Sequence, residues 1–128
     1  MTIEDLPNTL RPYWDYEFSS GPTTGEDYKS FQTKYRNWLR KEMRGYNVKL
    51  YPNHDEFSAV IEKPDVDVTK SRYVYLAISD VRYFKRQWAT SILVRTMRHS
   101  KDWTGGSNWY CSIADARRTV DRCMGQDV

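Results

Sequence analysis

Cysteine is scarce in this sequence, which contains only Cys111 and Cys123 among its 128 residues. Two thiols at this spacing match no zinc-binding signature and make a weak case for a disulfide. If residues 112–124 form a helix, a rise of about 1.5 Å per residue places the two thiols about 18 Å apart, which excludes a bridge between them. We therefore expect two reduced thiols, as in a cytosolic protein, and no structural metal.

Long apolar runs are also missing. No run approaches the roughly 20 residues that a membrane-spanning helix needs. The first ten residues, MTIEDLPNTL, begin with acids and contain no apolar stretch, so we expect no signal peptide. The sequence thus predicts a cytoplasmic protein without a membrane partner.

Strong catalytic signatures are absent as well, so we predict no cofactor. The Gly pair in WTGGSNW (residues 103–109) lacks the spacing of a phosphate-binding P-loop. We interpret Gly105 and Gly106 as a tight turn, with a phosphate cradle as the alternative. Asp80, His99 and Asp102 are weak catalytic candidates, because an imidazole near carboxylates can act as a general base. If they converge at one end of a sheet, they would suit a small nuclease-like enzyme acting on phosphodiesters.

Aromatic residues, by contrast, are abundant at 15% of the chain, and charge is unevenly spread. Residues 1–27 hold six acids and one base, a net charge of −5, whereas residues 28–128 hold 19 bases and 11 acids, a net charge of +8. A basic body behind an acidic leader favours nucleic acid or another polyanion as partner. A soluble protein with a loosely held acidic leader is the alternative.

Two helices are predicted, over residues 24–44 and 112–124. In the first, Thr24 and Asp27 fit a capping box, a stripe of large apolar residues recurs at helical spacing, and Gly45 fits a C-cap. In the second, Ser112 and Asp115 fit a capping box. Its apolar stripe consists of Ile113, Ala116, Val120 and Cys123.

Four strands are predicted between these helices. Their sequences are YNVKLY, EFSAVIE, RYVYLAIS and TSILVRTM, with DVRYFKRQW as a connector before the last. Short links favour antiparallel pairing. The fold class is therefore α+β: an antiparallel four-stranded sheet with two helices on one face, in the order α-β-β-β-β-α. Residues 1–22 form an acidic, aromatic N-terminal arm, and residues 23–128 form a single domain.

The strongest functional signal is a mixture of cations and aromatic rings. Residues 81–101 contain six bases and no acid, with aromatic residues interleaved. Cations fix phosphates and aromatic rings stack on bases, so the mixture is typical of nucleic-acid binding, although Arg and Trp also suit protein interfaces. The predicted contacts are Arg36, Arg40, Arg82, Lys85, Arg86, Arg95, Arg98, Lys101, Trp103 and Trp109.

The blocks DYKSFQTKYRNWLRK, YVYLAISDVRYF and ILVRTMRHSKDWTGGSNWY carry a resemblance over roughly residues 24–110. They resemble small, mostly uncharacterised accessory proteins of phages, plasmids and conjugative elements. The resemblance implies a bacterial host cell and an anti-defence, anti-CRISPR-like context. It assigns no catalytic residue.

These observations favour a non-enzymatic binding protein that acts on nucleic acid or on a nucleoprotein complex such as a CRISPR effector. One alternative is the nuclease-like enzyme built on Asp80, His99 and Asp102. Another is an interaction module that forms a homodimer or larger oligomer through exposed aromatic residues.

Overall fold

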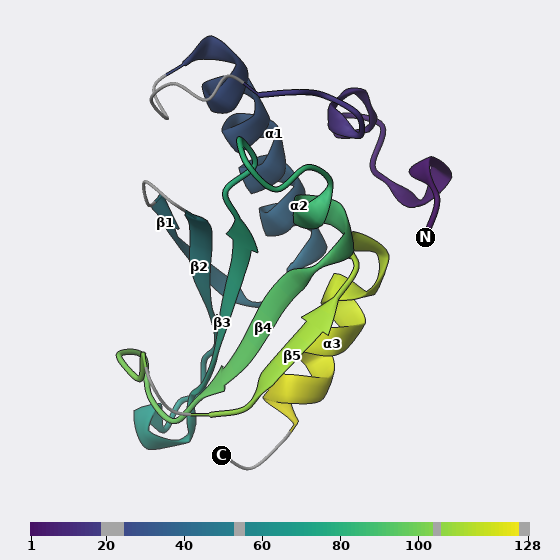
Figure 1. The fold of residues 1–128 in the computed structure, drawn as a ribbon. Coiled ribbons are helices and arrows are strands. Elements are labelled where there is room, and N and C mark those ends of the chain that lie inside the picture. Colours follow the sequence, from purple (N-terminus) through teal and green to yellow (C-terminus); the bar gives the residue numbers. More distant parts are fainter. Residues whose placement is uncertain (19–24, 53–55, 104–105, 126–128) are drawn as a thin grey trace.

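The structure is a computed structural model, and it describes residues 1–18, 25–52, 56–103 and 106–125. The described residues form one five-stranded antiparallel sheet with three α-helices (Figure 1). The strands run in the order β1-β2-β3-β4-β5, so each strand pairs with its neighbour in sequence. Their bounds are β1 Asn47–Pro52, β2 Glu56–Lys63, β3 Arg72–Ser79, β4 Ile92–Met97 and β5 Asn108–Cys111.

The helices are α1, α2 and α3, and short 3-10 turns accompany them. Their bounds are α1 Glu26–Glu42, α2 Gln87–Thr90 and α3 Ala116–Met124. The 3-10 turns are η1 Ile3–Asp5, η2 Arg11–Tyr13, η3 Val68–Lys70 and η4 Ile113–Asp115. Within the described ranges, no helix combines the length and the apolar character that crossing a bilayer requires.

The predicted α+β class and antiparallel sheet are confirmed, but the predicted counts of four strands and two helices are wrong. The missed strand, β5, has only four residues, NWYC, and directly follows a Gly-rich turn. The missed helix, α2, is a single turn inside the connector. Each was missed because a pattern of four residues carries little periodicity. Elements this short are stable because neighbouring elements pair with them or pack on them.

The two long predicted helices form as expected, with shifted starts. The stripe of α1 is buried, and Gly45 adopts a φ of +96° just after the helix, as a C-cap glycine does. Thr24 of the predicted capping box lies outside the described residues. The second helix begins with the 3-10 turn η4 before α3, yet its predicted stripe is buried throughout.

Both helices pack on the same face of the sheet (Figure 1). That face carries alternate strand residues, such as Ile61, Val74 and Val94, which are fully buried. Tyr35 of α1 meets Phe57 of β2 edge to face, with ring centroids 5.0 Å apart. The core of the protein therefore lies between this face and the helices.

The N-terminal segment adds a third layer over α1. Leu6 and Leu10 are buried, and Tyr13 and Phe18 stack 5.7 Å apart against Phe31 of α1. The segment turns through η1 and η2 instead of running extended. Its buried apolar side chains belong to the same core, so these side chains lie on the helix-covered side of the sheet.

Candidate nucleic-acid interface

The face of the sheet opposite the helices, called the distal face below, carries aromatic and charged side chains. Strand alternation sends every second residue to it, and the pairing register places these residues in rows across the strands. The row nearest the middle runs Lys49, Val60, Tyr75, Arg95 and Asn108. The row on one side of it begins with Tyr51 and Ser58. The row on its other side holds Asn47, Glu62 and Tyr73.

Residues 98–103, called the crossing segment below, leave β4 and fold back over this face. Its last residue, Trp103, meets Tyr51 of β1 and Tyr75 of β3, with ring centroids 6.1 Å and 5.9 Å apart and rings nearly perpendicular. Beneath this cluster Ser58 and Val60 are buried, although they lie on the face without helices. Trp103 itself remains 46% exposed, so part of its ring is available to a partner.

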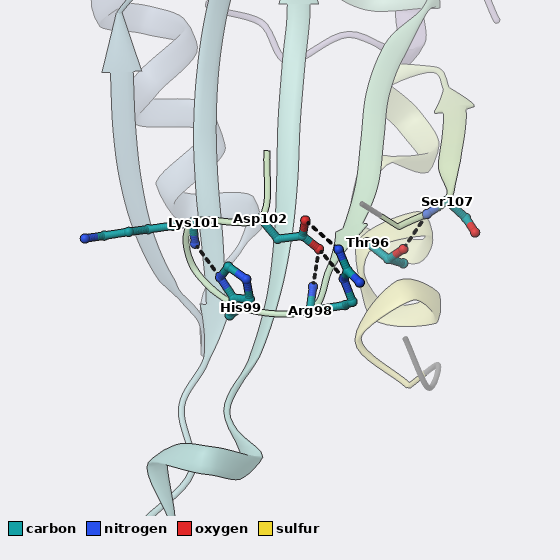
Figure 2. A network of polar contacts seen from close by, with 6 residues as sticks. All are labelled: Thr96, Arg98, His99, Lys101, Asp102 and Ser107. Atoms are coloured by element: carbon teal, nitrogen blue, oxygen red, sulfur yellow. Dashed lines mark hydrogen bonds and ion pairs between the residues drawn. The ribbon is translucent and has the colours of Figure 1, made fainter. Parts of the chain in front are cut away.

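A buried carboxylate holds the crossing segment in place (Figure 2). Asp102, only 4% exposed, accepts hydrogen bonds from the backbone N–H of Arg98 at 2.9 Å and from its Nε at 3.0 Å. The backbone N–H of Lys101 donates to Nδ1 of His99 at 3.3 Å. His99 and Asp102 therefore fix a turn, and the interaction with Asp102 raises the pKa of Arg98.

Cations lie over the aromatic rings of the distal face. The guanidinium of Arg95 lies 4.8 Å from the ring centroid of Tyr75, and Nζ of Lys49 lies 5.0 Å from that of Tyr51. Nε of Arg95 is buried without a hydrogen-bond partner. Among the described residues no carboxylate pairs with Arg95 or Lys49, which leaves both charges available to an anion.

The structure neutralises a second group of predicted contacts with acids. Arg82 pairs with Asp80, Lys85 lies 3.9 Å from Glu17, and Arg86 pairs with Asp15. The acidic leader thus folds onto the first part of residues 81–101, the stretch whose sequence contains no acid. This end of the molecule is consequently much less basic than its local sequence indicates.

The remaining predicted contacts are spread over the molecule. Arg40 is exposed on α1. Arg36 packs over Phe57 with its charge partly desolvated, which lowers its pKa. Trp109 of β5 is half-buried against the core, on the helix-covered side of the sheet. Only Arg95, Lys101 and Trp103 meet on the distal face, with Arg98 at its edge.

The catalytic candidates do not share a site. Asp80 follows the carboxyl end of β3, whereas His99 and Asp102 follow the carboxyl end of the antiparallel neighbour β4. The two ends are about 20 Å apart, since six residues of β3 at about 3.4 Å each separate them. Both acids are instead bound by arginine. The convergence expected for a nuclease-like enzyme is therefore wrong, and the described residues form no group of three metal-ligating side chains.

The thiols and Gly106 have structural roles. Both cysteines are free, and burial raises the pKa of each thiol. Gly105 lies outside the described residues. Gly106 has a φ of +85°, and beside it Thr96 and Ser107 continue the pairing of β4 with β5: Ser107 N–H donates to Thr96 Oγ1 at 2.7 Å (Figure 2). Gly106 thus belongs to a strand connection.

A hollow of about 910 Å³ lies elsewhere, between the N-terminal segment and α1. Lys34, Lys41 and Arg44 give it positive charge. Its one aromatic wall residue, Trp38, is 9% exposed and offers little ring surface for stacking. Arg117, also in its wall, already donates to the carbonyl oxygens of Glu42 and Arg44 at the end of α1. We therefore assign the distal face as the candidate interface.

Sequence reasoning missed the aromatic partners of Trp103. Tyr51 and Tyr75 stand at alternate positions in two predicted strands, on the side away from the apolar stripe of each strand. This alternation is a signal that marks them as non-core aromatics. Comparison of the chain with family models, with curated proteins and with solved structures found no match.

Proposed function

We propose that this protein binds single-stranded nucleic acid on the distal face of its sheet. The observation that carries the proposal is the perpendicular arrangement of Trp103 with Tyr51 and Tyr75, flanked by Arg95 and Lys49. Proteins bind single strands by combining exposed rings, on which bases stack, with cations that follow the backbone. A base stacked on a protein ring must be unpaired, which favours single strands over duplexes.

The first test is equilibrium binding of labelled single-stranded and double-stranded oligonucleotides of DNA and RNA at several salt concentrations. We expect tighter binding of single strands and a linear fall of log K with log salt, because cation–phosphate contacts release counterions. Binding that is insensitive to salt, or that favours duplexes, would contradict the proposal.

The stacking contribution is tested with Trp103→Ala. Loss of one stacked base costs roughly 1–3 kcal/mol, so affinity should fall about 5- to 150-fold. Phe84→Ala is the matched control, because Phe84 is 48% exposed, close to the 46% of Trp103, and lies in the connector after β3. Equal losses in the two variants would mean that exposed aromatic residues act nonspecifically.

The phosphate contribution is tested with Arg95→Ala. This variant should bind more weakly and should lower the magnitude of the salt slope by about 0.7, as expected for the loss of one phosphate contact to a single strand. Arg40→Ala removes an exposed cation from α1, on the other side of the sheet, and should leave the slope unchanged. If the salt slope changes in the Arg40 variant alone, the phosphate contacts lie on the helices and not on the distal face.

The resemblance to accessory proteins of mobile elements adds a cellular proposal. The chain would act in the cytoplasm of a bacterial host, and a nucleoprotein such as a CRISPR effector could present the single strand. Affinity capture from the host, with and without nuclease treatment, tests this. Partners that are still captured after nuclease treatment bind the protein directly. Partners that are no longer captured are bridged by nucleic acid.

A further inference from the structure

A hollow of about 360 Å³ opens on the distal face between the crossing segment and strands β1 to β3. Tyr51, Val60 and Trp103 form apolar walls, and Ser100 and Lys101 contribute from the crossing segment. Figure 2 shows Lys101 extending from the crossing segment toward β1, across the sheet from β4. This volume is near the lower limit of small-molecule sites, about 300 Å³, so the hollow suits one planar heterocycle.

One carboxylate belongs to this hollow, and residues of the two neighbouring strands hold it. Glu62 of β2 lies between Asn47 of β1 and Tyr73 of β3 in the pairing register. Nδ2 of Asn47 donates to Oε1 of Glu62 at 2.8 Å. Tyr73 faces Glu62 from β3, and burial together with the interaction with Glu62 raises the pKa of its hydroxyl. The carboxylate is thus fixed before any ligand arrives.

Glu62 has acceptor capacity left for a ligand. A carboxylate offers about four lone-pair positions, and the amide of Asn47 occupies one of them, while Tyr73 lies opposite Glu62 in the pairing register. The remaining positions accept hydrogen bonds from N–H or O–H donors, and the Watson–Crick edges of bases offer N–H donors. Lys49 and Lys101 line the same hollow, and their charges suit a phosphate. The hollow therefore combines an acceptor for a base, an aromatic wall for stacking and cations for a backbone.

We propose that this hollow binds a single guanine base, with Glu62 accepting hydrogen bonds from its Watson–Crick edge. This inference rests on the proposed function and gives it base specificity. Guanine presents two adjacent N–H donors, which match the two oxygens of a carboxylate. Adenine and cytosine present an amino group beside an acceptor nitrogen, and thymine and uracil flank their single N–H with carbonyl oxygens that repel a carboxylate.

The test uses four oligonucleotides, each an oligo-dT with G, A, C or T at one central position. The wild-type protein should bind the G-containing strand about 5- to 150-fold more tightly than the all-T strand, the discrimination of one bidentate contact. In Glu62→Gln one carboxylate oxygen becomes an NH₂ donor that faces a donor of guanine. The preference should fall below about threefold, while affinity for the all-T strand stays within a factor of two or three.

Glu42→Gln is the matched control, because it removes the same charge from the exposed end of α1 and should keep the guanine preference. Equal binding of all four strands by the wild-type protein, or an unchanged preference in Glu62→Gln, would overturn this inference and leave the proposed function intact. A protein that binds neither these four strands nor their RNA counterparts at low salt would instead overturn the proposed function.

Discussion

Gly106 allows the sharpest test of the structure, because no side chain fits at its position. A Cβ built there would lie 1.8 Å from the carbonyl oxygen of Thr96 and 2.7 Å from its carbonyl carbon. These are backbone atoms of β4, so no rotamer change relieves the overlap. The φ of +85° adds strain for any L-residue. Gly106→Ala must therefore separate the two chain segments at this point.

The cost can be estimated from two contributions. The left-handed backbone conformation costs an alanine about 1–2 kcal/mol. Separating the segments breaks two hydrogen bonds, Thr96 N–H to Ser107 O at 3.1 Å and Ser107 N–H to Thr96 Oγ1 at 2.7 Å. At about 0.5–1.5 kcal/mol each, they bring the total loss of unfolding free energy to about 2–5 kcal/mol. A domain with a total of about 5–15 kcal/mol would be strongly destabilised.

The assay is urea unfolding followed by circular dichroism, with Gly45→Ala as the control. Gly45 has a similar φ of +96°, but a Cβ there would meet nothing within 4 Å. Gly45→Ala should therefore lose only about 1–2 kcal/mol. If the free energy of unfolding falls equally in the two variants, Gly106 does not lie as close to Thr96 as the structure places it.

Three further predictions concern the acidic residues. Asp102→Asn should lower the free energy of unfolding by about 1.5–3 kcal/mol, because a buried carboxylate loses its charge-assisted bonds, and thermal denaturation measures this. For Asp80, burial alone would raise the pKa, but the hydrogen bonds and charge of Arg82 outweigh it, and the net pKa is lowered. The stability that Asp80 contributes is thus present above its unfolded pKa of about 3.9 and is lost as the pH falls through its lower folded pKa. When the pH is lowered from about 5 to about 2, the free energy of unfolding should therefore fall less in Asp80→Asn than in the wild-type protein. Asp15→Asn breaks an exposed pair with Arg86 and should cost no more than about 1 kcal/mol in the same unfolding assay, so a loss of several kcal/mol would contradict the exposed geometry.

Much of the fold could be predicted because its longer elements carry periodic patterns. The stripe of α1 recurs at helical spacing, and RYVYLAIS matches β3 residue for residue. The strand β5 could not be recognised in the same way, since its burial alternates over only four residues, which is too short a segment to reveal a period in the sequence. Its stability comes from pairing with β4 across the turn at Gly106.

The candidate site was less predictable, because it depends on residues that are distant in sequence. Trp103 and Lys101 were predicted contacts from local composition. Their neighbours Tyr51 and Tyr75 become neighbours only when the crossing segment returns over the sheet. No local pattern encodes the return, which depends on the buried carboxylate of Asp102.

The sequence by itself determined the α+β class, the antiparallel strands and the buried stripes, because apolar periodicity fixes which face of each element avoids water. Only the tertiary structure decided which charges remain available. Asp15 meets Arg86 across 71 positions of the chain, and Asp80 and Asp102 are held at opposite ends of the sheet. Electrostatic interactions act through space rather than along the chain, so the location of the basic surface follows from the fold.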